Sequence, residues 1–118
     1  MPNALDRKVI RVSPVILRIR EARSRGAEFL RHIRGFFRDD QDDLVFLSAL
    51  GAGHSIDEHL KWIFGMVEHD SAVFRRAQQN GYEIVLQVFS ESRSFTVSPE
   101  AFFLPHKLHL PVEFFFLK

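Results

Sequence analysis

Residues 55–89 constrain the fold more than any other part of the chain. They begin with Ser55 and, three residues later, Glu58, the pairing with which a capping box starts a helix. Apolar residues then recur at helical spacing, so one face of this helix is expected to be buried. The residues of this stripe are Ile56, Leu60, Ile63 and Val67.

A second helix and a strand are expected to follow within the same stretch. The helix starts at Ser71 and ends at Asn80-Gly81, because glycine accepts the left-handed conformation that closes many helices. Residues 82–89 then alternate in polarity, as a strand with one buried face does. The apolar face of this strand carries Ile84, Leu86 and Val88, and the other face carries Glu83 and Gln87.

Extended segments are also expected on both sides of this stretch. Residues 9–20 are predicted to be extended, with Pro14 either marking a sheet edge or moving the strand start to Val15. Residues 44–50 are a continuous apolar run that favours a buried central strand. Residues 112–117 are predicted to form a terminal strand rich in Phe.

The remaining elements complete the predicted fold. Residues 22–38 have an apolar face and basic residues elsewhere, which predicts a helix that ends near Arg38. Residues 95–97 are predicted to return as a short strand, and Ser98-Pro99 is a further helix start. We therefore expect an α+β fold with a mostly antiparallel sheet of four or five strands. Its helices would pack on one face, on the ferredoxin-like plan.

Size and composition indicate one domain of an ordinary kind. The 118 residues fit a single α+β domain over residues 1–118, with residues 1–7 as a loose terminus. There is no cysteine, which excludes disulfides, a zinc–thiolate site and a cysteine nucleophile. We find neither a signal peptide nor a run of roughly 18 apolar residues that could span a membrane. A cytoplasmic protein without a membrane partner is therefore expected.

The chain carries no recognisable catalytic or metal-binding motif. Its six histidines form no His-Glu-x-x-His pattern, and no carboxylate stands at the spacing that would complete a metal site. Residues 51–53, Gly-Ala-Gly, stand between a strand and a helix like part of a phosphate-binding loop, but the lysine of such a loop is absent. We therefore predict a protein that is not an enzyme and uses no cofactor and no metal.

Charge is divided unevenly along the chain, and this gives two candidate binding sites. Residues 1–38 hold ten Lys or Arg and three Asp or Glu, whereas the remainder holds six and twelve. An acidic run, which lacks the alternating ligands and the glycine of a calcium loop, could pair with a basic surface of a partner protein. This run consists of Asp39, Asp40, Asp42 and Asp43.

The basic half supplies the alternative site, for nucleic acid. Arginines spaced over a strand and a helix could follow a phosphate backbone. The residues of this set are Arg18, Arg20, Arg23, Arg25 and Arg31. The aromatic pattern of an RNA-recognition motif is absent, so nucleic acid is the less favoured partner.

The C-terminal half resembles a bacterial family, the domain of unknown function 4279. The similar segments are IDEHLKW at residues 56–62, NGY at 80–82, VFS at 88–90, FTVSPE at 95–100 and LPVEF at 110–114. The resemblance implies a small α+β cytoplasmic domain of bacteria and assigns no activity and no catalytic residues. Small bacterial domains of this kind often accompany toxins as immunity proteins, so the resemblance also implies an immunity role.

These observations together favour a non-enzymatic protein-binding domain. An immunity protein that occludes a toxin is one form of it, with the four aspartates pairing with a basic active-site surface. A homodimer is compatible with this reading, because the strand at residues 112–117 would offer a pairing edge if it lies at the side of the sheet. A small-molecule pocket or an enzyme on the open sheet face is a third hypothesis, and it requires polar groups that converge in a cavity.

Overall fold

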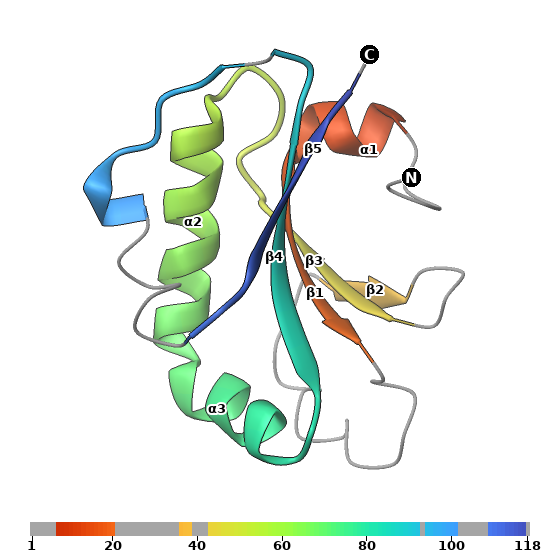
Figure 1. Cartoon of the computed structure of the whole chain (residues 1–118), viewed down its shortest axis with the longest axis vertical. Coiled ribbons are helices and arrows are strands. Elements are labelled where there is room, and N and C mark those ends of the chain that lie inside the picture. Colours follow the sequence, from red (N-terminus) through yellow and green to blue (C-terminus); the bar gives the residue numbers. More distant parts are fainter. Residues whose placement is uncertain (1–6, 21–35, 39–42, 93, 102–108, 118) are drawn as a thin grey trace.

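The computed structural model describes residues 7–20, 36–38, 43–92, 94–101 and 109–117. These residues form a five-stranded sheet with helices against it (Figure 1). The strands are β1 (Val15–Arg20), β2 (Phe36–Arg38), β3 (Leu44–Leu47), β4 (Glu83–Ser90) and β5 (Val112–Phe116). The helices are α1 (Arg7–Val12), α2 (Ile56–His69) and α3 (Ser71–Gln79).

The sheet is mixed, with the strand order β2-β3-β1-β4-β5. β1 lies in the centre and pairs antiparallel with both β3 and β4, and β2 pairs antiparallel with β3. β4 and β5 are parallel. The α+β class is therefore confirmed, the sheet is not wholly antiparallel, and the ferredoxin-like plan stays a prediction.

The predicted helix–helix–strand stretch forms, although β4 is buried on both faces and not on one as predicted. The Ser55 hydroxyl accepts the backbone N–H of Glu58 at 3.1 Å, and the Glu58 carboxylate accepts the backbone N–H of Ser55 at 2.9 Å. This capping box satisfies two N–H groups that a helix start leaves without partners. α3 starts at Ser71, and Gly81, with φ +87°, turns the chain into β4.

The two faces of the sheet differ in composition. The helix face is the face that packs on α2 and α3, and it is wholly apolar at its centre. Its sheet residues are Val15, Leu17, Ile19, Leu44, Phe46, Ile84, Leu86 and Val88. The opposite face, here the polar face, combines a small apolar cluster with buried charged and amide side chains. The apolar cluster is Ile10, Ile16, Val45 and Phe89.

Helix α1 departs from two predictions. Residues 9–12 belong to this helix and are not extended, so the strand starts at Val15, the second of the two predicted possibilities. The helix ends before Pro14 because the residue ahead of a proline is driven out of helical conformation. Ile10 packs with Ile16 on the polar face, so helices cover both faces of the sheet and not one (Figure 1).

Two further predictions are wrong for the described residues. Residues 36–38 form β2 on the edge of β3 and are not the end of a helix, because strand pairing overrides local helical spacing. Residues 95–97 are not a strand, since β4 is already paired on both sides by β1 and β5. Residues 99–101 are helical, as the Ser98-Pro99 start predicts. Residues 1–6 and the rest of the predicted helix at residues 22–35 lie outside the described residues.

None of the helices described above has the length and apolar composition needed to cross a lipid bilayer.

Candidate functional site

β5 forms one edge of the sheet, and its backbone shows which groups face outward. The N–H of Leu86 donates to the carbonyl of Pro111 at 3.0 Å, and the N–H of Leu117 donates to the carbonyl of Ser90 at 2.7 Å. Successive residues of a strand point their backbone groups to opposite sides. Val112, Phe114 and Phe116 therefore direct their N–H and C=O groups away from β4, and no other described strand pairs with them.

Exposed aromatic side chains accompany these outward backbone groups. Phe114 is 44% exposed and Phe116 is 55% exposed, both on the helix-face side of β5. The ring of Phe95 lies beside them, with centroids at 6.0 Å from Phe114 and 6.5 Å from Phe116. We call Val112, Phe114, Phe116 and Phe95 the β5 edge surface.

Among the residues that the structure describes, the edge surface has none of the usual protection against pairing. Edge strands are commonly blunted by lysine, proline, a bulge or a covering segment. β5 pairs with β4 in one unbroken register and carries a single charge, Glu113, which points to the polar face. On that face the Phe115 ring stacks on the Phe89 ring, with centroids 4.9 Å apart, which adds a side-chain contact between β5 and β4. Within the described part of the chain, the outer side of β5 is therefore open to another strand.

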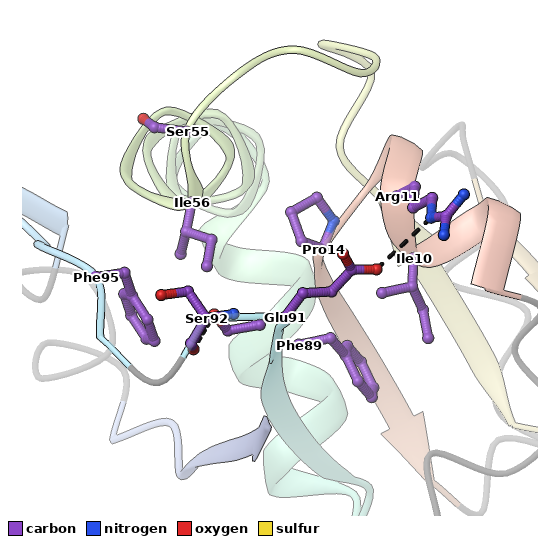
Figure 2. Close-up of a pocket in the computed structure, with 10 residues that line it drawn as sticks. Ile10, Arg11, Pro14, Ser55, Ile56, Phe89, Glu91, Ser92 and Phe95 are labelled. Atoms are coloured by element: carbon purple, nitrogen blue, oxygen red, sulfur yellow. Dashed lines mark hydrogen bonds and ion pairs between the residues drawn. The ribbon is translucent and has the colours of Figure 1, made fainter. Parts of the chain in front are cut away.

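A pocket of about 460 Å³ adjoins this surface (Figure 2). It opens between α1, the start of α2 and the end of β4, and its wall includes Phe95 and Phe89. The other lining residues are Ile10, Arg11, Pro14, Ser55, Ile56, Ser90, Glu91 and Ser92. Arg11 Nε lies 3.6 Å from Glu91 Oε1, and the Ser90 hydroxyl donates to the carbonyl of Ser92 at 2.6 Å. These polar groups are thus engaged with one another along the rim.

The structure brings one predicted acidic residue and one predicted basic residue together on the polar face. Arg18 Nη1 donates to Asp43 Oδ2 at 3.0 Å, and Arg18 Nε donates to Gln87 Oε1 at 2.9 Å. Arg18 is 1% exposed and Asp43 is 8% exposed. Neither residue is presented to a partner at the surface, so this pair serves to join β1, β3 and β4.

Arg20 continues this polar network toward the edge of the sheet. It forms ion pairs with Glu83 and with Glu113, the latter at 3.2 Å. The hydrogen bond to Glu83, together with the charge of Glu113, raises the pKa of Arg20. Gln87 Nε2 donates to Glu113 Oε1 at 2.8 Å and links the network to Arg18. The other predicted site residues lie outside the described part of the chain: Asp39, Asp40, Asp42, Arg23, Arg25 and Arg31.

A buried hydrogen-bond chain joins β1, β3 and α2, and the sequence does not reveal it. The N–H of Ser48 donates to the Ser13 hydroxyl at 2.8 Å, and His59 Nδ1 lies 2.8 Å from the Ser48 hydroxyl oxygen. A serine next to a histidine can form a nucleophile pair. Here all three side chains are buried, so the arrangement positions α2 on the sheet. Burial lowers the pKa of His59, and the charge of His54 adds to this effect.

The described residues contain no group of three or more His, Cys, Asp or Glu side chains placed to hold a metal ion. Comparison of the chain with protein-family models, with curated proteins and with solved structures finds no match. The resemblance to the domain of unknown function 4279 stays a prediction.

Proposed function

We propose that this chain is a non-enzymatic protein-binding domain that binds an extended segment of another polypeptide along the outer edge of β5. One observation carries the proposal: the outward backbone groups of Val112, Phe114 and Phe116 lie next to two exposed Phe rings. Strand addition takes its affinity from main-chain hydrogen bonds and its specificity from alternate side chains. The β5 edge surface offers both kinds of contact.

The expected contribution of the side chains is large enough to matter. Complete burial of a Phe side chain stabilises by about 1.5–3 kcal/mol, and roughly half of each of Phe114 and Phe116 is available. An exposed apolar patch beside a free strand edge is typical of interaction sites. The adjoining pocket, with Phe95 in its wall, extends the apolar surface beyond the end of the strand.

This proposal moves the binding site away from the charged segments. Asp43 and Arg18 are buried together, and Arg20 is paired with two carboxylates. The acidic-run mechanism thus loses one of its four aspartates, and the nucleic-acid alternative loses support at two of its five arginines. An immunity protein that occludes a toxin would be one instance of the proposed function, with β5 as the contact.

Selection from a peptide library tests the proposal. The protein is attached to a surface at low density, so that copies do not meet, and is offered random linear peptides displayed on phage. We expect the recovered peptides to alternate apolar residues. Phe114→Pro should weaken their binding by roughly tenfold or more, since it removes an outward N–H and a Phe ring but no bond to β4.

The matched control is Val12→Lys, which changes an equally exposed apolar residue of α1. It should leave peptide binding unchanged. Failure to recover any peptide, or equal binding by Phe114→Pro and the unmodified protein, would contradict the proposal.

A further inference from the structure

We infer that the extended segment that docks on β5 is β5 of a second copy of this chain, so that two sheets join into one continuous sheet about a two-fold axis. This inference rests on the proposed function, because it uses the same β5 edge surface. Two-fold dimers are the commonest closed assemblies, and their interfaces bring one surface against itself. The edge must therefore be complementary to its own copy.

The backbone of β5 meets this condition when the two strands are antiparallel and centred on Phe114. Phe114 then lies opposite Phe114 of the second copy, and Val112 lies opposite Phe116 of the second copy. These are the outward residues of the edge. Directly opposite residues of this kind exchange both of their N–H···O bonds. Every outward backbone group of β5 would thus find a partner in one register.

The side chains fit the same register. On the helix-face side, Val112 and Phe116 of opposite copies place a small residue beside a large one, and the two Phe114 rings meet at the axis. This covers the exposed parts of Phe114 and Phe116. Phe95 of each copy flanks the row, since its ring already contacts both residues. Cross-strand aromatic and branched pairs of this kind stabilise antiparallel strands.

The charge carried by β5 is also compatible with pairing to β5 of a second copy. Glu113 is the charged residue of β5, and two such residues directly opposite would repel each other. In this register Glu113 lies opposite Phe115 of the second copy, so like charges are not paired. Glu113 also keeps its bonds to Arg20 and Gln87 of its own chain. A two-fold pair of this kind is closed and leaves no β5 edge for further copies.

Sedimentation equilibrium of the full chain tests the inference first. We expect a dimer, with Phe114→Pro raising its dissociation constant by roughly tenfold or more. Val12→Lys should leave the constant unchanged. Because Phe114→Pro could disturb folding, Phe116→Lys serves as a second variant, and circular dichroism checks that each variant keeps its secondary structure.

Disulfide trapping then tests the register. The chain has no cysteine, so a single introduced cysteine reports on its own position. Under mild oxidation Phe114→Cys should form a cross-linked dimer with itself, because opposite Cα atoms in such pairs lie about 5.5 Å apart, within disulfide range. Val112→Cys should cross-link to Phe116→Cys when the two proteins are mixed, and far less to itself. Val12→Cys is the control and should not cross-link.

The outcomes separate the inference from the proposed function. A dimer that Phe114→Pro weakens, with cross-linking in the stated register, supports the inference. A chain that stays monomeric while its peptide binding depends on Phe114 overturns the inference and leaves the proposed function standing. A monomer that also binds no peptide overturns both. A dimer that neither edge variant weakens places the contact elsewhere and overturns the inference.

Discussion

The two faces of the sheet share β1, β3 and β4 but are stabilised in different ways. On the helix face, Leu17 lies in register with Phe46 and Leu86, and all three are buried against α2 and α3. One residue further along β1, Arg18 is equally buried but bonds to Asp43 and Gln87. An apolar side chain can be buried against many different neighbours, because the hydrophobic effect is not directional. A buried guanidinium requires hydrogen-bond acceptors or a carboxylate at particular positions.

The contrast between the two faces explains how the register of the sheet is specified. A shift of one residue would move Arg18 to the helix face, among apolar side chains without its hydrogen-bond partners. It would also move Leu17 out of the main core. The helix face therefore supplies most of the stabilisation, and the polar face penalises wrong pairings.

The largest change in the free energy of unfolding is expected from a substitution on the helix face. Phe46 is fully buried, and its ring packs edge-on against Phe74 at 5.9 Å. Phe46→Ala should lower the free energy of unfolding by about 3–5 kcal/mol, because it removes apolar contact and leaves a cavity. Urea denaturation measures this. Val12→Ala, at an exposed site, should change it by no more than about 0.5 kcal/mol. If Phe46→Ala lowered the free energy of unfolding as little as Val12→Ala, the stabilising role given to the helix face would be wrong.

The next largest effect concerns the buried ion pair. Arg18→Met should cost about 3 kcal/mol, because it leaves the buried Asp43 carboxylate without this guanidinium. Combining it with Asp43→Leu should recover most of the loss, since the charge left behind is also removed. Urea denaturation of both single variants and the double variant measures the coupling. Losses that simply add would show that the two side chains act independently.

A smaller effect is expected from pH, through His59. Burial lowers the pKa of His59 below its ordinary value of 6.5, so the unfolded chain takes up a proton at a higher pH than the folded chain does. The free energy of unfolding should therefore fall as the pH drops below about 6.5. His59→Gln should flatten this slope, which denaturation at a series of pH values measures. Phe46→Ala is the control, because it lowers stability without changing the slope. A free energy that holds constant through this range would exclude the role given to His59.

The smallest effect belongs to an ion pair at the surface. The Arg11 and Glu91 side chains are mostly exposed and lie 3.6 Å apart. Arg11→Ala should change the free energy of unfolding by no more than about 1 kcal/mol, because water screens such pairs. Thermal and urea denaturation can both detect a change of this size in the free energy of unfolding. A loss comparable to that of Arg18→Met would mean that burial does not separate the two pairs.

Local sequence was enough to predict much of the helix face. The Ser55 capping box and the stop at Gly81 depend on neighbouring residues, and both form as expected. β4 also forms, but it is buried on both faces and not on one, and Gln87 lies inside the polar face. The polar face could not be predicted in this way. Arg18 meets Asp43 at a separation of 25 residues and Gln87 at a separation of 69. These contacts follow from the order of the strands in the sheet, which a local sequence pattern does not predict.

The candidate site shows the same division. A Phe-rich terminal strand was expected, and β5 is that strand, at the edge of the sheet. Its parallel pairing with β4 and the neighbouring Phe95 ring depend on how residues 91–101 pass the sheet, and hence on tertiary structure. The local pattern at residues 95–97 suggested a strand because it could not show that both sides of β4 were taken.

The central position of β1 has a consequence for how the chain folds during synthesis. β1 is translated before β3 and β4, yet it pairs with both, and Gln87 emerges 69 residues after Arg18. At about 5–20 residues per second, the ribosome needs roughly 3–14 s to supply that partner. β3 follows sooner, but until β4 is made, β1, a strand rich in Val, Ile and Leu, lacks one of its two neighbours. The central pairing of this sheet thus joins residues far apart in the sequence, and contacts of this kind slow folding.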